Sequence, residues 1–469
     1  MSDRPDLAVI GSGPGGYRAA VYAALRGLEV AIVERADWGG TCLNRGCIPK
    51  KDWHHSAKTI AGSARLADRG VAGGPLQGDL AAAWQHQQRV VNRVRESYLS
   101  FMDRLGVHQY RGHARLNAGG KVVIDGPDAG TLAPGHVILG TGSRPAPIPG
   151  VEPVSGRVLT TDMLFDEPAP QAGEVIVVGA GVIATEMAFI LAQLGCAVNW
   201  LATREPLAKS PFTPQARKAL TDKLAEFGVG WQAGGRLVAT RVENGRAVAE
   251  LDDSSTHAAD WILLGTGREP VTDDLGLEEA GVTSDDRGYV EVDAHRETSR
   301  AGVYAIGDCA NPRQTANHAM ADAVVAVRNI LDPGSTEADD TMVPEVVYSA
   351  LELARLGLND DQAEDAGWEP AVGFTSFETN PRALGADCQE GFTRLLADMD
   401  SGTFLGGEIV GESAGELIHL LSTRADPATA LAEIASGRYN HPALAEEALN
   451  STETLAANWG LGPEIFGPG

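Results

Sequence analysis

The chain has 469 residues, of which 43% are hydrophobic, and a net charge of −25 from 63 acidic and 38 basic side chains. This length allows several domains, and so acidic a chain is repelled by nucleic acid and by anionic membranes, so we expect it to bind neither. Five cysteines are too few for a secreted disulfide scaffold, and no signal segment precedes the first predicted strand, so we expect a cytoplasmic protein.

A glycine-rich turn between a strand and a helix is the first recognisable motif. The predicted strand at 6–10 leads into Gly11, Gly13 and Gly16, and the strand after the helix ends on Glu34. In a dinucleotide site, such glycines let the backbone approach the pyrophosphate, and the carboxylate accepts the ribose hydroxyls. The order of these features predicts a dinucleotide-binding domain.

Two cysteines, Cys42 and Cys47, follow this motif five positions apart. Residues so spaced in a regular helix face directions about 140° apart, so a disulfide between them needs an irregular turn, which Gly46 can supply. A thiolate at a helix N-terminus is also stabilised. The pattern favours a redox-active disulfide. A zinc site completed by His54 and His55, and two unpaired structural thiols, remain the alternatives.

The next segments connect this region to a second domain. Helices are predicted over 52–66 and 79–105, on either side of a glycine-rich stretch at 70–78. Short strands then lead to 137–145, and the proline-rich stretch that follows, 145–149, indicates a crossing between domains.

The segment 175–202 repeats the first motif. It contains a strand, then Gly179 and Gly181, a helix and a further strand, so it indicates a buried βαβ unit and not a membrane span. Ala202 lies 23 residues after Gly179, where the first motif has its carboxylate. The carboxylate expected of a site that selects NAD is therefore missing.

Later segments fit a chain with two dinucleotide sites. Residues 261–270 are similar in sequence to 137–145, and the predicted strand at 303–308 ends on Asp308, which could reach a bound polyol. Two dinucleotide sites and a reactive cysteine pair suggest two cofactors that exchange electrons with a disulfide.

Together with segments 406–418 and 440–446, these motifs resemble flavin-dependent pyridine nucleotide–disulfide oxidoreductases over nearly the whole chain, and are most similar to lipoamide dehydrogenases. The resemblance implies an α/β fold with two Rossmann-like dinucleotide-binding domains and a C-terminal α+β dimerisation domain. The implied domains are an FAD-binding domain at 1–150, an NAD(P)-binding domain at 151–275, a central domain returning to FAD at 276–340 and an interface domain at 341–469.

The resemblance also implies two sets of cofactor-binding residues. For FAD these are Gly11, Gly13, Gly16, Glu34, Thr41, Lys51, Gly112, Thr141, Gly142 and Asp308. For the nicotinamide nucleotide they are Gly179, Gly181, Glu186 and Gly267. NAD(H) is the nucleotide that the resemblance implies, and Ala202 leaves NADP(H) open.

In a homodimer of this kind, Cys47 lies near the flavin, Cys42 exchanges with the substrate, His441 of the other subunit moves the proton and Glu446 orients the imidazole. The implied substrate is a lipoyl group on a carrier protein. Departures at Lys50 and elsewhere leave open a small disulfide such as glutathione or mycothione. Mercuric reductase ranks third because the C-terminal tail lacks a cysteine pair, and a non-enzymatic flavoprotein scaffold is the remaining alternative. No metal site is expected.

Overall fold

The computed structural model describes residues 3–166, 170–424 and 426–467. The chain divides into two compact units. The first comprises Met1–Val178, Leu191–Asn199 and Gly234–Ala338, and the second comprises Gly179–Ile190, Trp200–Ala233 and Asp339–Gly469.

The first unit is built on a five-stranded parallel sheet. In spatial order the strands are β18 (Val303–Ala305), β7 (His136–Leu139), β1 (Leu7–Ile10), β2 (Val30–Glu34) and β3 (His108–Arg111). Apolar residues run through β1, β2, β7 and β18 because both faces of a parallel sheet are buried, whereas the edge strand β3 is polar and partly buried.

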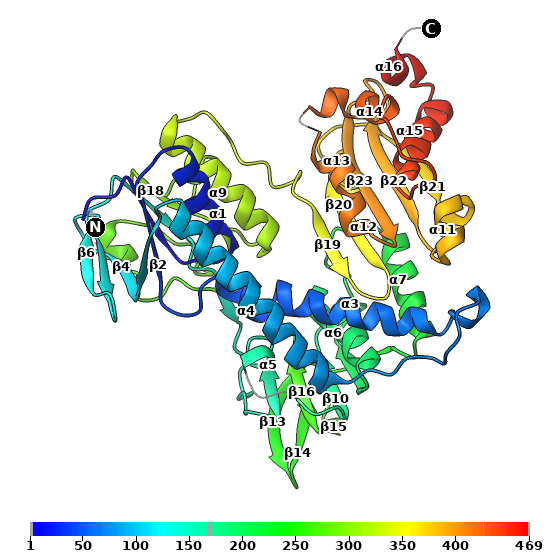
Figure 1. Cartoon of the computed structure of the whole chain (residues 1–469), viewed down its shortest axis with the longest axis horizontal. Coiled ribbons are helices and arrows are strands. Elements are labelled where there is room, and N and C mark those ends of the chain that lie inside the picture. Colours follow the sequence, from blue (N-terminus) through cyan, green and yellow to red (C-terminus); the bar gives the residue numbers. More distant parts are fainter. Residues whose placement is uncertain (1–2, 167–169, 425, 468–469) are drawn as a thin grey trace. The chain divides into compact units, whose positions relative to one another are not determined.

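Two helices cover one face of this sheet. Helices α1 (Pro14–Leu25) and α9 (Ala316–Leu331) lie side by side and share a core with Leu7 and Val9 of β1 (Figure 1). Proline at the first position of α1 suits a helix start, because its missing N–H would have no helical partner there.

A small antiparallel sheet covers the opposite face. Ala8 and Ile10, which alternate with the residues facing the helices, pack against this sheet because successive side chains of a strand point to opposite faces. Its strands are β4 (His113–Leu116), β5 (Val122–Asp125) and β6 (Gly130–Leu132).

The first unit also contains further strands and helices. Strands β9 (Val158–Thr160), β16 (Trp261–Leu264) and β10 (Glu174–Val178) pair in parallel. Strands β13 (Leu237–Glu243), β14 (Arg246–Leu251) and β15 (Thr256–Ala259) form an antiparallel sheet, and β8 (Ser143–Pro145) pairs with β17 (Arg268–Pro270). The helices are α2 (Gly40–Arg45), α3 (Cys47–Ser63), η1 (Ala67–Arg69), α4 (Leu80–Arg104), α5 (Met163–Asp166), α8 (Leu277–Ala280) and η2 (Gly307–Cys309).

The second unit contains a five-stranded antiparallel sheet whose core is covered by C-terminal helices, of which α15 (Glu446–Trp459) packs across two strands (Figure 1). The strand order is β19 (Glu345–Tyr348), β20 (Glu352–Gly357), β23 (Phe404–Gly411), β22 (Phe392–Asp398) and β21 (Pro370–Ser376). The helices are α10 (Asp360–Asp365), η3 (Phe377–Thr379), α11 (Pro381–Ala386), α12 (Ala414–Leu417), α13 (His419–Ser422), α14 (Pro427–Ala435), α15 (Glu446–Trp459) and α16 (Gly462–Phe466).

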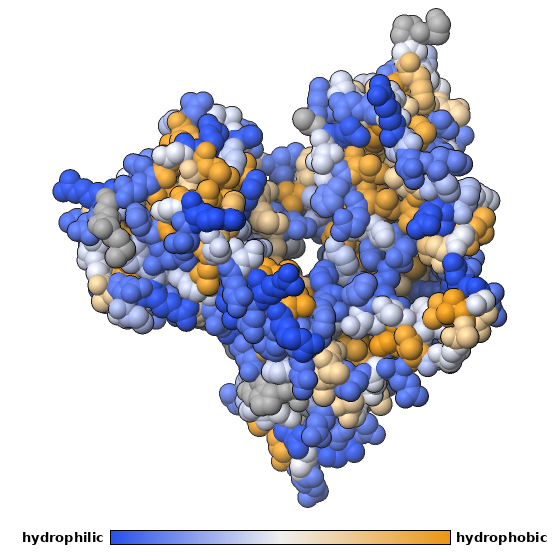
Figure 2. All heavy atoms as spheres, in the orientation of Figure 1, coloured by the Kyte–Doolittle hydropathy of each residue, from blue (hydrophilic) through white to orange (hydrophobic). Residues whose placement is uncertain are grey.

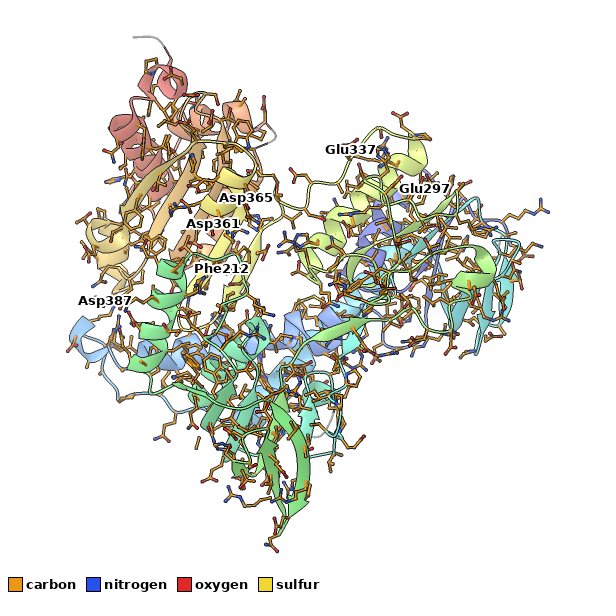
Figure 3. All side chains as sticks on the ribbon, turned by 180° about the vertical axis from the view of Figure 1, so that it is seen from behind. Phe212, Glu297, Glu337, Asp361, Asp365 and Asp387 are labelled. Atoms are coloured by element: carbon orange, nitrogen blue, oxygen red, sulfur yellow. A yellow bond between two sulfur atoms is a disulfide. The ribbon has the colours of Figure 1, made fainter. Side chains whose placement is uncertain are left out.

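Helix α7 (Pro214–Glu226) of the second unit is anchored to this sheet through its N-terminus. Phe212, labelled in Figure 3, is buried just before the helix. Thr213 caps the helix and donates its backbone N–H, at 2.9 Å, and its hydroxyl to Glu408 of β23. Burial raises the pKa of Glu408, whereas the hydrogen bonds from Thr213 lower it. Strand β12 (Trp231–Ala233) pairs in parallel with β11 (Ala197–Ala202).

The predicted α/β class is confirmed, with differences at element ends. The helix predicted over 52–66 begins at Cys47, because the chain bends at Gly46. The helix predicted over 79–105 is α4, which begins at Leu80, because Asp79 is its N-cap and its carboxylate accepts the Ala82 N–H at 3.0 Å. The predicted division into four domains stays a prediction.

Hydrophilic side chains cover much of the face in Figure 2, in keeping with the net charge of −25. Among the described residues, no helix is both long enough and apolar enough to cross a membrane.

Candidate active site

The carboxyl ends of the first unit's parallel strands bring predicted flavin residues together. Ile10, Val33 and Leu139 stand opposite one another in the strand register. Because ligands of such sheets bind outside the carboxyl ends of the strands, the residues that follow each strand line one edge. These residues are Gly11 after β1, Glu34 at the end of β2, Gly112 after β3, Thr141 and Gly142 after β7, and Asp308 after β18.

The glycine turn after β1 combines tight packing with open space. A Cβ atom at Gly11 would lie 2.3 Å from the Gly140 oxygen, and one at Gly16 would lie 1.9 Å from the Gly11 oxygen. A Cβ at Gly13 or at Gly142 would meet nothing within 4 Å. The turn is therefore closed toward the protein and open at the N-terminus of α1, which is where a pyrophosphate is bound by a helix end.

Glu34 lies buried beside this turn. Its Oε2 accepts hydrogen bonds from the Ser12 N–H at 2.9 Å and the Ser12 hydroxyl at 2.7 Å, and its Oε1 accepts the Ala36 N–H at 2.8 Å. A carboxylate offers about four acceptor positions, so capacity remains for a ribose hydroxyl. Together with the open glycine turn, this carboxylate fits the adenosine end of FAD.

Cys42 and Cys47 form a disulfide with their Cα atoms 4.6 Å apart. The bond closes between two helices, because Gly46 interrupts the chain with φ −135° and ψ −102° after α2 and before α3. Cys47 is the first residue of the 17-residue α3, so the helix dipole stabilises its thiolate after reduction. With the two sulfurs bonded to each other, the zinc and free-thiol alternatives are wrong.

The disulfide segment packs directly on the glycine turn. A Cβ at Gly40 would lie 2.7 Å from the Gly13 Cα, and the Gly39 N–H donates to the Ser12 hydroxyl at 2.9 Å. Both glycines have positive φ, which side-chain-bearing residues rarely adopt. These contacts fix the redox helix pair against the predicted pyrophosphate site.

Asn44 holds the turn of α2 that carries Cys42. Its amide donates to the Gly40 oxygen at 2.8 Å and to the Trp38 oxygen at 3.0 Å, while its Oδ1 accepts from Arg95 of α4. Thr41 lies in α2 and Lys51 in α3, both partly buried.

Asp308 and its neighbours form a buried polar group at the edge of the sheet. The Ser143 hydroxyl donates to Asp308 Oδ2 at 2.6 Å. Burial raises the pKa of the Asp308 carboxyl, and the Ser143 hydrogen bond and the Arg268 charge lower it. Thr141 donates its hydroxyl to the Val271 oxygen at 2.5 Å, which fixes the turn after β7.

Three predicted nicotinamide-site residues belong to the second unit. Gly179 has φ +134° and donates its N–H to the Leu201 oxygen at 2.9 Å, and a Cβ at Gly181 would face open space. Glu186 is buried on α6 (Val182–Gln193), where its Oε1 accepts the Tyr348 N–H at 2.7 Å. Gly267, the fourth, lies in the first unit with φ +117°.

The predicted acid–base pair is formed in the second unit. His441 Nδ1 lies 2.8 Å from Glu446 Oε1, and Glu446 Oε2 accepts the Ala443 N–H at 2.7 Å. The hydrogen bond from His441 lowers the pKa of Glu446. A carboxylate that binds Nδ1–H leaves Nε2 as the nitrogen that takes or gives a proton. The His441 side chain is 75% exposed, so Nε2 can be reached from outside.

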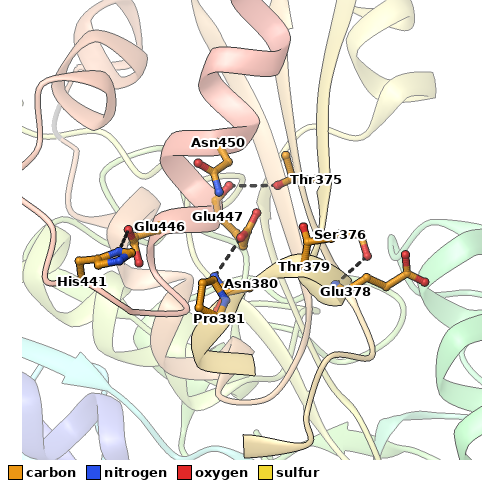
Figure 4. Close-up of a pocket in the computed structure, with 10 residues that line it drawn as sticks. All are labelled: Thr375, Ser376, Glu378, Thr379, Asn380, Pro381, His441, Glu446, Glu447 and Asn450. Carbon is orange, nitrogen blue, oxygen red and sulfur yellow. Dashed lines mark hydrogen bonds and ion pairs between the residues drawn. The ribbon is translucent and has the colours of Figure 1, made fainter. Parts of the chain in front are cut away.

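His441 and Glu446 border a pocket of about 400 Å³ (Figure 4). Next to Glu446 in α15, Glu447 accepts a hydrogen bond from the Asn380 amide at 2.9 Å. The lining is rich in carboxylates, hydroxyls and amides, and it comprises Thr375, Ser376, Glu378, Thr379, Asn380, Pro381, His441, Glu446, Glu447 and Asn450.

Sequence reasoning missed Ser12, Asn44, Ser143 and Arg268. Ser12 and Asn44 stand inside recognised motifs, so their positions marked them as candidates. Their hydrogen-bond partners, Glu34 and Arg95, could not be read from the motifs. Ser143 and Arg268 contact each other across 125 positions, which a single sequence does not reveal.

Family models match both parts of the chain. Residues 5–326 match the pyridine nucleotide-disulphide oxidoreductase model, and residues 343–451 match the dimerisation domain of the same family. The dimerisation domain supports a homodimer.

Individual proteins agree with the family models. The chain is 34% identical over 452 residues to dihydrolipoyl dehydrogenase 2 of Haloarcula marismortui, covering 94% of each chain. It is 32% identical over 448 residues to dihydrolipoyl dehydrogenase of Chlorobaculum tepidum, covering 94% of this chain and 95% of that one.

A solved structure shares the fold. LpdA from Mycobacterium tuberculosis superposes with a TM-score of 0.88 at 22% identity, covering 97% of this chain and 99% of that chain. The enzymes of the matched family depend on FAD and on a pyridine nucleotide. The chain belongs to the pyridine nucleotide-disulphide oxidoreductase family, and it is a dihydrolipoyl dehydrogenase-like flavoprotein enzyme whose redox disulfide is Cys42–Cys47.

Proposed function

We propose that this enzyme oxidises dihydrolipoyl groups on a carrier protein, with FAD and NAD(H) as cofactors and with an active site shared between two subunits. The observation that carries the proposal is the Cys42–Cys47 disulfide at the start of α3, packed on the glycine turn through Gly40. Relatives at 30–34% identity are named dihydrolipoyl dehydrogenases, which favours a lipoyl substrate.

FAD would be held by the residues at the carboxyl edge of the first unit's sheet. Glu34 would accept hydroxyls of the adenosine ribose, Gly13 would leave room for the pyrophosphate, and Asp308 would accept a ribityl hydroxyl. When bound, FAD carries the electron pair between the cysteine pair and the pyridine nucleotide.

Thiol–disulfide exchange is the step that the cysteines perform. A substrate thiolate attacks the Cys42 sulfur, forms a mixed disulfide and releases Cys47 as a thiolate. The second substrate thiol, once deprotonated, attacks the substrate sulfur of the mixed disulfide and releases Cys42. The dithiol substrate becomes a disulfide, and its two electrons reduce the Cys42–Cys47 disulfide to two separate cysteines.

His441 of the partner subunit would accept the proton of the substrate thiol. Its hydrogen bond to Glu446 fixes the ring and stabilises the imidazolium that forms. Because Nε2 carries the proton, the exposed side of the ring is the side that must meet the partner's disulfide.

The pocket beside His441 favours a neutral substrate over an anionic one. Its lining includes the carboxylates of Glu378, Glu446 and Glu447, and His441 is the sole basic side chain among its lining residues. The amide and hydrocarbon chain of a lipoyl group carry no charge, whereas glutathione disulfide carries several carboxylates that these side chains would repel.

The adenosine end of the nicotinamide site permits NADP(H) beside NAD(H). Ala202 ends β11 without a carboxylate that would repel a 2′-phosphate. Arg204 and Lys209 follow it and are exposed, while Glu205 pairs with Arg217 at 3.8 Å. Because Glu205 pairs with Arg217, its negative charge counteracts the charges of Arg204 and Lys209 less. We therefore propose turnover with NAD(H) and appreciable turnover with NADP(H).

Steady-state kinetics test this function. The holoenzyme is supplied with dihydrolipoamide and either NAD⁺ or NADP⁺, and in the reverse direction with lipoamide, glutathione disulfide or Hg(II) and either reduced nucleotide. We expect the highest kcat/KM for the lipoyl pair. A preference for glutathione disulfide or Hg(II) would contradict the lipoyl assignment, and no turnover with any acceptor would contradict a catalytic role.

A further inference from the structure

A short ribbon joins the turn proposed for the flavin to the turn proposed for the nicotinamide nucleotide. Strands β8 and β17 are antiparallel, with Ser143 opposite Pro270. The Val271 N–H donates to the Gly142 oxygen at 2.9 Å, and at the other end the Ala146 N–H donates to the Gly267 oxygen at 3.0 Å. Both turns are therefore held by the same pair of strands.

Arg268 is the first residue of β17, at the end of the ribbon next to Gly267, and its side chain is 12% exposed. Its Nε donates to the Ser143 hydroxyl oxygen at 2.8 Å and its Nη2 to the Ser143 carbonyl at 2.8 Å. Its Nη1 donates to Asp162 Oδ1 at 2.8 Å, which balances the buried charge. The guanidinium is thus fixed by three acceptor atoms on two residues.

These contacts determine which way the Ser143 hydroxyl points. A guanidinium can only donate, so the Ser143 oxygen must accept from Arg268 and its single proton is left for another acceptor. That acceptor is Asp308 Oδ2, 2.6 Å away. The resulting chain of hydrogen bonds runs from Asp162 through Arg268 and Ser143 to Asp308, and each bond polarises the next.

We propose that Arg268 is a positioning residue for the flavin, which acts through Ser143 to hold the Asp308 carboxylate in its binding orientation. The inference rests on the proposed function, in which Asp308 binds FAD. Since Arg268 directly follows Gly267, the same side chain links the nicotinamide turn to the flavin carboxylate.

The charge state of Asp308 gives this role its own signature. Burial raises the pKa of the Asp308 carboxyl above its usual value, and the Ser143 hydrogen bond and the Arg268 charge oppose that rise. Other titratable groups around Asp308 include His318 of α9, Cys309 in the same turn, Tyr289, and Asp322 of α9, whose Oδ2 accepts the Gly307 N–H at 3.0 Å. Without Arg268 the carboxyl takes up a proton at a higher pH, and a protonated carboxyl is a poorer acceptor for a polyol hydroxyl.

Arg144 provides a matched control on the same ribbon. It is an exposed arginine that pairs with Glu269 at 2.6 Å and with Asp273, so its replacement removes ribbon ion pairs without touching Ser143 or Asp308. A role limited to holding the ribbon together predicts similar effects for both arginines.

The test measures FAD binding to apoprotein by flavin fluorescence between pH 5 and 8 for the wild type, R268M, S143A and R144Q. We expect R268M and S143A to bind FAD about tenfold more weakly at pH 7, as loss of a charge-assisted hydrogen bond implies. We also expect both to release FAD at a higher pH on acidification. R144Q should match the wild type.

Three outcomes would overturn the inference: unchanged FAD binding in R268M, weaker binding without any shift of the release pH, or an equal change in R144Q. If R268M does not fold, S143A decides, because it leaves the Arg268–Asp162 pair in place. D308N separates this inference from the proposed function: wild-type FAD binding by D308N would contradict the proposed flavin site itself, whereas weak binding by D308N with normal binding by R268M would contradict only the role of Arg268.

Discussion

Gly13 and Gly16 belong to one turn, but the structure predicts opposite consequences for their replacement by alanine. A Cβ at Gly16 would lie 1.9 Å from the Gly11 carbonyl oxygen, whereas a Cβ at Gly13 would have no atom within 4 Å. Gly13 has φ −60°, which alanine adopts without strain. We therefore expect G16A to damage the fold of the apoprotein and G13A to damage only FAD binding.

The magnitudes follow from these contacts. Overpacking costs about 1–3 kcal/mol when side chains can adjust, and a backbone oxygen cannot rotate away, so G16A should destabilise the first unit by at least about 3 kcal/mol. G13A replaces a glycine cap by a poorer one and should cost about 1 kcal/mol or less. Its Cβ would occupy the space proposed for the pyrophosphate, and loss of one charge-assisted hydrogen bond there weakens FAD binding about 10- to 100-fold.

The two effects separate in two measurements on each variant: thermal melting of the apoprotein, and FAD affinity by fluorescence titration. G13A should melt close to the wild type and bind FAD weakly, and G16A should melt well below both. A G13A apoprotein that melts as low as G16A would refute the reasoning, as would G13A with wild-type FAD affinity.

Three further predictions concern the catalytic residues and the nucleotide. His441→Gln should lower dithiol oxidation about 10²- to 10⁴-fold, as for loss of a general base, while NADH still reduces the flavin. Hybrid dimers of one Cys42→Ser subunit and one His441→Gln subunit should retain about one working site, because one site keeps both Cys42 and the partner's histidine. Inactive hybrids would contradict a shared site. Two-electron reduction should give a long-wavelength absorption band, because the Cys47 thiolate would lie against the oxidised flavin. Cys47→Ser should abolish this band and keep FAD bound, and a retained band would mean that the roles of the two cysteines are reversed. Ala202→Glu should lower kcat/KM for NADP(H) about 10- to 100-fold with little change for NAD(H), from the added charge repulsion; a wild type that already rejects NADP(H) would contradict the assignment of Ala202.

Motifs with fixed local geometry could be predicted from the sequence. Gly16 is required by its close contact with Gly11 within one strand–turn–helix unit, and Glu34 stands at the end of the next strand, so order and spacing were sufficient. The same holds for Cys42 and Cys47, because Gly46 between them indicated the break that the disulfide needs.

Interactions between distant segments could not be predicted in this way. Arg268 and Ser143 are 125 positions apart, and their contact depends on the ribbon that pairs β8 with β17. The sequence similarity between 137–145 and 261–270 could be recognised, but the pairing of β8 with β17 within these two segments could not. Ser12 likewise gave no sign that its hydroxyl would bridge Glu34 and the Gly39 N–H, because that contact requires the tertiary fold.

The central claim is that electrons enter the protein from a dithiol through Cys42 and Cys47. Oxidised enzyme is mixed anaerobically with one equivalent of dihydrolipoamide, quenched with an alkylating agent and mapped by mass spectrometry, and a second sample receives NAD⁺. We predict new alkylation at Cys42 and Cys47 only, formation of lipoamide, loss of both labels with production of NADH after NAD⁺ is added, and no NADH from a Cys42→Ser variant. NADH production by that variant, or labelling of Cys196, Cys309 or Cys388 in place of the pair, would contradict the claim.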